Sequence, residues 1–219
     1  MPTKLNGPRQ APASGRTARQ LVILLHGLGA DGNDLIGLAP EWSQFLPDAE
    51  FLSPDAPFPC DMAPYGRQWF SFQTRDPAAI LQSALVAVPI LNGFIDDALR
   101  ERGLDDGKLA LVGFSQGTMM SLHVGLRRPK PAAAILGYSG RLMSPHKLAA
   151  EIQARPPVML IHGDADDIVP CDALDTAVTA LTEANVPVRH MLRPGLGHGI
   201  DPLGLEEGGR FLAEAFAGT

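Results

Sequence analysis

Short apolar runs rich in Val, Ile and Leu alternate along this chain with longer amphipathic stretches, and this alternation constrains the fold more than any other feature. Strands that are buried on both faces have continuous apolar sequences, whereas helices that cover a sheet are apolar on one side only. The pattern predicts an α/β fold with a mostly parallel central sheet and helices on both faces. The expected strands are 21–25, 49–52, 108–112, 132–136, 158–161 and 188–192.

Helices are expected in most of the intervals. The clearest is 79–102, where apolar residues recur near helical spacing and Pro89 should introduce a kink. Residues 54–75 differ, because they combine four prolines with five aromatic residues and predict a long ordered loop. Such a loop is either functional or packed by its own side chains. The other expected helices are 33–45, 118–128, 171–184 and 203–216.

The composition predicts a single domain over residues 1–219, with an irregular segment at 1–19. Hydrophobic residues make up 45% and charged residues 19%, which is enough apolar material for a core. The 18 Lys plus Arg against 24 Asp plus Glu give 18 − 24 = −6, a charge that disfavours nucleic acid as a partner. We expect no apolar run of membrane-spanning length, no stable membrane insertion and no secretory signal, so the default location is cytoplasmic.

Cys60 and Cys171 are the only cysteines. They are too few for a disulfide scaffold, and they lack the spacing of a metal or redox motif. The sequence leaves open whether they pair. No metal ion and no organic cofactor are expected.

The motif Gly-Phe-Ser-Gln-Gly at 113–117 lies between an apolar run and an expected helix. A serine on a sharp turn between a strand and a helix projects its hydroxyl clear of the sheet, and the flanking glycines relieve the crowding there. This is the pattern of a nucleophile elbow. It indicates acyl transfer through Ser115.

A serine at its free pKa is a poor nucleophile, so a histidine must take its proton and an acid must orient that histidine. In hydrolases with this elbow the acid and then the histidine follow the serine, which excludes His26. His198 lies in a glycine-rich loop just after the last expected strand, so we expect it to be the base. The other later histidines lie in a helix or a strand or precede the acids: His123, His146, His162 and His190.

The acid is expected in the turn after strand 158–161. Three aspartates lie there, Asp164, Asp166 and Asp167, and the spacing alone does not choose among them. Functional groups of open α/β sheets gather at the carboxyl ends of the strands, so the position suits any of the three. The others should have structural roles, such as capping the next turn.

An oxyanion that forms on the substrate carbonyl usually needs two backbone N–H donors. Gln116, the residue after the serine, is expected to supply one of them from the start of a helix. The other should come from the glycine-rich turn at 26–29, where Leu28 is the candidate. The same turn lacks the spacing of a dinucleotide-binding motif, so that class of protein is excluded.

With these motifs in place, residues 20–216 resemble the carboxylesterase, phospholipase and acyl-protein thioesterase family of small α/β-hydrolases. The resemblance rests on the motif at 113–117 and on three others: Leu-His-Gly-Leu-Gly-Ala-Asp-Gly at 25–32, His-Gly-Asp-Ala-Asp-Asp-Ile-Val-Pro at 162–170 and Gly-His at 197–198. It implies the α/β-hydrolase fold, Asp166 as the acid, and oxyanion donors at Leu28 and Gln116. Asp167 stands where the family has a proline. The resemblance also implies a homodimer.

Residues 67–70, Arg-Gln-Trp-Phe, resemble the family's Arg-x-Trp-Phe stretch near the site. Trp69 therefore either borders the acyl groove or packs beneath the loop. Only 139–156 could hold an insertion after the strand that follows the elbow helix, so we expect no large lid and an open site walled by 54–75.

The expected function is hydrolysis of carboxylic esters or thioesters with short to medium acyl chains, through an acyl-enzyme on Ser115. The substrate is a small molecule or an acyl group on a lipid or a protein. The alternatives are a main role as an acyl-protein thioesterase or lysophospholipase, acyl transfer to another acceptor, and a catalytically silent binding module.

Overall fold

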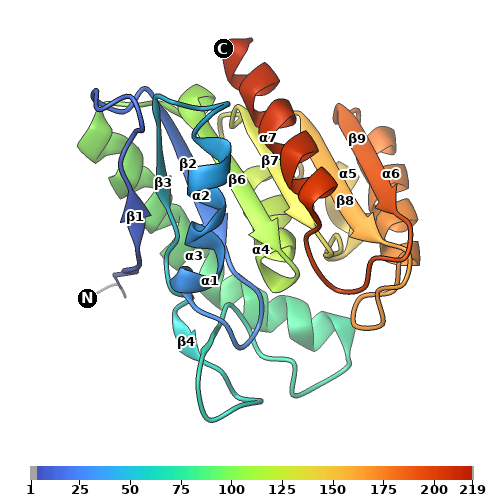
Figure 1. Cartoon of the computed structure of the whole chain (residues 1–219). Helices are drawn as coiled ribbons and strands as arrows, with labels where there is room; N and C mark the ends of the chain where they lie inside the picture. The colour runs from blue at the N-terminus through green and yellow to red at the C-terminus, as the bar shows by residue number, and fades with distance from the viewer. Residues whose placement is uncertain (1–3, 219) are drawn as a thin grey trace.

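A seven-stranded sheet forms the centre of the computed structural model, which describes residues 4–218. Six of its strands are parallel, and all six coincide with the predicted apolar runs to within two residues. Their carboxyl ends lie along one edge of the sheet (Figure 1). These strands are β2 (Gln20–Leu25), β3 (Ala49–Leu52), β6 (Leu109–Phe114), β7 (Ala134–Tyr138), β8 (Val158–Gly163) and β9 (Val188–Arg193).

The seventh strand, β1 (Arg9–Gln10), pairs antiparallel with β3 and gives the order β1-β3-β2-β6-β7-β8-β9. The segment 1–19 was expected to be irregular throughout, so β1 corrects that expectation for the described residues. A polar dipeptide can extend a sheet edge through backbone hydrogen bonds alone, without an apolar pattern to reveal it.

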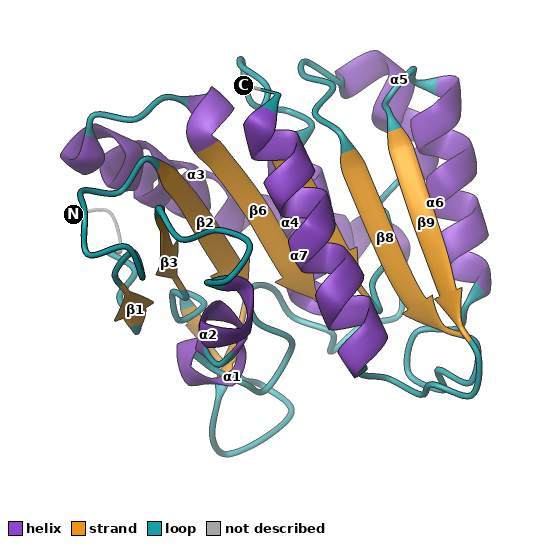
Figure 2. Ribbon diagram, turned by 45° about the horizontal axis from the view of Figure 1, so that its top comes forward, coloured by secondary structure: helices purple, strands orange, loops and turns teal. Residues whose placement is uncertain are grey.

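Helices cover both faces of the sheet, as predicted. Figure 2 shows α1, α2 and α7 over one face, with α3, α4, α5 and α6 on the other side. Two 3-10 turns, η1 (Asp106–Lys108) and η2 (Pro145–Lys147), complete the fold. The helices are α1 (Gly32–Ile36), α2 (Leu38–Trp42), α3 (Pro77–Arg102), α4 (Gln116–Gly125), α5 (Leu148–Glu151), α6 (Asp172–Glu183) and α7 (Pro202–Ala217).

The single helix expected at 33–45 is wrong, because α1 and α2 are separate and meet at Gly37. Proline has no backbone N–H, so Pro40 cannot donate the hydrogen bond to Ile36 that a continuous helix would need. The helical period of the sequence continues across the break, which is why the pattern alone suggested one helix.

Helix α3 is 26 residues long and continues through Pro89. Its most apolar 18-residue window has a mean hydropathy of 1.9, so by length and composition it could cross a membrane. The expectation that no run reaches that length is therefore wrong. Leu91 and Ile95 are fully buried on its inner face, in the same core cluster as Leu21 and Ile23 of β2.

The strands carry apolar residues on both sides, and this divides the core between the two faces. In β2, Leu21, Ile23 and Leu25 point toward α3 and α4, whereas Val22 and Leu24 point toward α2 and α7. All five are completely buried. This packing fixes the register of the central strands, and with it the positions of the loops at their carboxyl ends.

The segment 54–75 contains a short hairpin of β4 (Phe58–Pro59) and β5 (Arg67–Gln68), which pair antiparallel outside the main sheet. Backbone hydrogen bonds tie β5 to the turn after β2: Arg67 N–H donates to Ala30 O, and Gly29 N–H donates to Arg67 O. The long loop is therefore ordered, as expected, and lies against the glycine-rich turn at 26–29.

Candidate active site

Ser115 occupies the turn between β6 and α4 with φ 53° and ψ −113°, a strained backbone conformation for a residue other than glycine. Its N–H donates to Tyr138 O of β7 at 2.9 Å, which holds the turn against the sheet. The side chain is only partly buried. This is the geometry of a nucleophile elbow, in which the turn presents the hydroxyl above the strand ends.

The elbow packs so closely on β2 that its second glycine has no room for a side chain. A Cβ on Gly117 would lie 1.7 Å from Leu25 O, and one on Gly113 would lie 2.3 Å from the backbone of Gly117. The close approach brings the first turn of α4 down onto the end of β2. It explains why the motif has glycine two residues to either side of Ser115.

His198 lies in the loop between β9 and α7, and its ring packs on the ring of Phe114 with centroids 4.9 Å apart. Phe114 immediately precedes Ser115, so the histidine lies beside the elbow. Nδ1 of His198 is 2.8 Å from Oδ2 of Asp166. A carboxylate can only accept, so Nδ1 carries the proton and Nε2 is left with a lone pair that can act as a base.

Asp166 is buried in the turn after β8, where Oδ1 accepts the N–H groups of Ile168 at 3.0 Å and Val169 at 2.8 Å. Burial by itself would raise the pKa of Asp166. The hydrogen bonds from His198 and from the two amides outweigh it, so the pKa of Asp166 lies below its usual value. The group is therefore a carboxylate at neutral pH.

The other two aspartates of this turn have different surroundings. Asp167 is exposed, although it follows Asp166 directly in the chain. The carboxylate of Asp164 accepts the N–H of Gly195 at 2.7 Å, and so it fastens the loop that carries His198 to the end of β8. Only Asp166 contacts His198 among the three.

His162 is a neighbour of this site that the sequence reasoning did not use. It is buried at the end of β8, and its Nε2 donates to Val169 O at 2.7 Å and lies 3.2 Å from Oδ2 of Asp166. The ring therefore supports the turn that holds Asp166. One indication of this role was present in the sequence, because His162 stands two residues before Asp164 in the motif at 162–170.

The remaining histidines lie in other surroundings. The ring of His26 is buried, where its Nδ1 donates to Gly27 O at 2.7 Å and its Nε2 accepts the N–H of Ala56 at 3.0 Å. Both nitrogens are thus engaged, and burial lowers the pKa of His26. His123 is buried on α4, whereas His146 and His190 are exposed.

The turn at 26–29 lies directly against the serine. A Cβ on Gly27 would be 3.5 Å from Cβ of Ser115. Within the described residues, the N–H groups of Leu28 and Gln116 have no hydrogen-bond acceptor in the protein. Gln116 is the first residue of α4, where an N–H has no partner inside the helix. Both groups are therefore available to a ligand.

Trp69 does not border an open groove. Its side chain is completely buried, and Nε1 donates to His26 O at 3.0 Å. Its ring lies 5.8 Å from that of His26, so this side chain of the segment 54–75 packs against the turn at 26–29. Of the two roles considered for Trp69, the structure supports packing, because an indole N–H that is buried needs an acceptor and finds one in the backbone of the turn.

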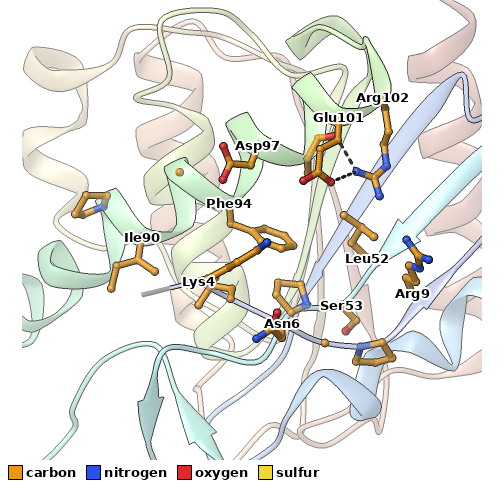
Figure 3. Close-up of a pocket in the computed structure, with 17 residues that line it drawn as sticks. Lys4, Asn6, Arg9, Leu52, Ser53, Ile90, Phe94, Asp97, Glu101 and Arg102 are labelled. Carbon is orange, nitrogen blue, oxygen red and sulfur yellow. Dashed lines mark hydrogen bonds and ion pairs between the residues drawn. The ribbon is translucent and has the colours of Figure 1, made fainter. Parts of the chain in front are cut away.

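A cavity of about 560 Å³ lies away from these residues, between the N-terminal segment and α3. Figure 3 shows Lys4, Asn6 and Phe94 among the residues that line it, and Arg102 at one side with an ion pair to Glu101. None of Ser115, Asp166 and His198 belongs to its lining.

Cys60 and Cys171 are free thiols, and no cluster of potential metal ligands occurs in residues 4–218.

The sequence pattern of the family described as Phospholipase/Carboxylesterase matches residues 10–215 of this chain. The chain belongs to this family. It is 32% identical over 206 residues to acyl-protein thioesterase 1 of Schizosaccharomyces pombe, covering 89% of this chain and 88% of that protein. It is 31% identical over 189 residues to esterase YpfH of Escherichia coli, covering 85% and 78%.

Among solved structures, the crystal structure of esterase PE8 superposes with a TM-score of 0.92 and 43% sequence identity, covering 97% of this chain and 99% of that one. The match confirms the α/β-hydrolase fold. Membership of the family makes this chain a carboxylic-ester hydrolase that acts on esters or thioesters.

Proposed function

We propose that this protein hydrolyses carboxylic esters or thioesters of short to medium acyl chains through a Ser115–His198–Asp166 triad. One observation carries the proposal. The hydrogen bond of 2.8 Å between Asp166 and Nδ1 of His198 holds a basic ring nitrogen beside the strained turn of Ser115. These are the roles that a serine nucleophile requires from its partners.

In the proposed mechanism His198 takes the proton of the Ser115 hydroxyl as its oxygen attacks the substrate carbonyl. The negative charge of Asp166 stabilises the imidazolium that forms, and the N–H groups of Leu28 and Gln116 hold the oxyanion. His198 then donates its proton to the leaving alkoxide or thiolate, which leaves an acyl-enzyme. A water molecule, activated by the same histidine, releases the acid and regenerates the serine.

The test is a panel of p-nitrophenyl esters with Ser115→Ala as the control variant. Loss of the nucleophile should lower kcat by a factor of about 10⁴ or more, while the variant stays folded. Turnover in Ser115→Ala equal to that of the original chain would refute the triad. A fluorophosphonate probe should label the original chain on Ser115 and leave the variant unlabelled, whereas a catalytically silent module would not react at all.

A narrower role as an acyl-protein thioesterase has one specific observation in its favour, the 32% identity to a protein of that name in Schizosaccharomyces pombe. The identity to esterase YpfH is nearly equal, so a role as an esterase is equally supported. Rates for matched oxygen and sulfur esters, measured over a series of chain lengths, separate the two. Cytoplasmic location and a homodimer stay predictions from the sequence.

A further inference from the structure

The side chain of Gln116 is completely buried, and both of its polar atoms bind the backbone of one other segment. Oε1 accepts the N–H of Trp69 at 2.7 Å, and Nε2 donates to Phe70 O at 2.8 Å. The two residues it holds are more than 40 positions earlier in the chain. The amide of Gln116 therefore clamps the end of the β4–β5 hairpin segment onto the first residue of α4.

The same segment also holds the glycine-rich turn after β2. Arg67 exchanges two backbone hydrogen bonds with it, one with Gly29 at 2.9 Å and one with Ala30 at 2.8 Å. The indole N–H of Trp69 donates to His26 O at 3.0 Å. These three bonds lie on both sides of Leu28 in the chain and leave its own N–H without a partner in the described protein.

We propose that residues 67–70 form a bridge that sets the separation of the two oxyanion donors, and that the Gln116 side chain and Trp69 act as positioning residues through it. The inference rests on the proposed function, in which the N–H groups of Leu28 and Gln116 bind the oxyanion. It adds a second role for Gln116, whose backbone binds the substrate and whose side chain holds the other half of the hole in place.

The bridge has little freedom to slide. A Cβ on Gly66, which has φ +78°, would lie 1.9 Å from Gly29 O, so the hairpin and the turn are in direct backbone contact. The guanidinium of Arg67 donates to Ala56 O and Pro57 O, both at 2.8 Å, and so ties β5 to the residues just before β4 and stiffens the hairpin. Oxyanion donors act only within a few tenths of an ångström of their ideal distance, so a loosened bridge should slow catalysis before it unfolds the chain.

The experiment compares Gln116→Met with Gln82→Met. The first change removes both bonds to the bridge but keeps the backbone N–H and the side-chain volume, whereas Gln82 is exposed on α3. On p-nitrophenyl acetate, Gln116→Met should lose about 10- to 100-fold in kcat with KM changed by less than about threefold, because the oxyanion forms only in the transition state. Gln82→Met should match the original chain.

Trp69→Phe removes a single hydrogen bond, to His26 O, and should lower kcat by a smaller factor with KM again unchanged. The double variant should lose less than the product of the two single effects, because both residues act through one bridge. Multiplicative losses, or losses in KM rather than kcat, would indicate independent packing roles and overturn the inference. If Gln116→Met does not fold, Trp69→Phe and Gln116→Glu decide the question by the same comparison of kcat and KM. Gln116→Glu keeps an acceptor for the N–H of Trp69 but loses the donor to Phe70 O.

Failure of the inference is distinguishable from failure of the proposed function. If Gln116→Met is folded and its kcat is within twofold of the original while Ser115→Ala is inactive, the role of the bridge is refuted and the triad stands. If Ser115→Ala is active, both the bridge and the triad are refuted.

Discussion

At the scale of single residues, two adjacent aspartates have opposite surroundings. The turn after β8 buries Asp166 under two backbone N–H groups and His198, and it exposes Asp167 to solvent. Asp167 stands where the resemblance to the family led us to expect a proline, and its side chain is exposed. The change in sequence leaves the carboxylate that contacts His198 in place.

We predict that Asp166→Asn lowers kcat by a factor of about 10³ or more, because an amide in place of the carboxylate can no longer stabilise the imidazolium. Asp167→Asn is the matched control, with the same chemical change one position along, and should keep full activity. Steady-state kinetics on a soluble ester measure both. Equal losses in the two variants would contradict the assignment of the acid.

A second residue, His123, should make the protein sensitive to acid. Burial, reinforced by the nearby charge of Arg127, lowers the pKa of His123 from 6.5 to about 4, and its Nδ1 has no hydrogen-bond partner in the described chain. The unfolded chain therefore binds a proton between pH 6.5 and about 4 that the folded chain does not. Stability must then fall as the pH falls through this window.

Between pH 7 and pH 4, the free energy of unfolding should drop by about 3 kcal/mol more in the original chain than in His123→Gln, which cannot titrate. Urea denaturation at a series of pH values measures the difference. Parallel pH profiles for the two proteins would show that His123 is already protonated or solvated in the folded state. His26 stays in both chains, so its own lowered pKa cancels from the comparison.

At the scale of elements, the contact between α4 and β2 determines how the elbow is built. Gly117 lies in the first turn of the helix, where alanine would favour helix formation, yet the backbone of Leu25 occupies the place of a Cβ. The helix must start this close to the sheet for the N–H of Gln116 to reach the strand ends. Close packing therefore overrides helix propensity at this position.

Gly117→Ala should destabilise the fold by about 3 kcal/mol or more, since backbone atoms on both elements would have to move. Gly93→Ala is the control, because Gly93 is exposed on α3 and a Cβ there meets no atom within 4 Å. That substitution should stabilise the helix by about 0.5–1 kcal/mol. Thermal denaturation of the two variants should thus shift in opposite directions, and a neutral Gly117→Ala would contradict the close approach.

The elements also show what a sequence can reveal. Apolar runs located all six parallel strands, because strands buried on both faces need continuous hydrophobic sequence. No such pattern predicted the two-residue β1, which pairs only through its backbone. None predicted the break between α1 and α2 at Gly37. The contacts of Gln116 with Trp69 and Phe70 were out of reach for another reason: they join positions far apart in the chain, and only the packed fold brings them together.

At the scale of the whole molecule, access to the site depends on the segment between β7 and β8. It holds only η2 and the four-residue α5. A large lid would need a longer insertion there, and the absence of a large lid stays a prediction from the sequence. The β4–β5 segment, which the sequence led us to expect as a wall of the site, is tied to the turn after β2 by the backbone bonds of Arg67 with Gly29 and Ala30.

A protein without a lid should show no interfacial activation. With tributyrin, the rate should rise smoothly and saturate as the concentration passes the solubility limit of the ester, because no segment has to open at a lipid surface. A pH-stat titration across that limit measures it. A several-fold step in rate at the onset of emulsion would indicate a moving cover that the short β7–β8 segment does not suggest.

The loop of His198 has a consequence for how the protein is made. It is fastened to β8 through Asp164 and Gly195 and follows β9, the last strand to leave the ribosome. A nascent chain therefore exposes the sequence of the serine elbow before it exposes His198, the proposed general base. In the proposed mechanism Ser115 stays inactive until almost the whole polypeptide has emerged.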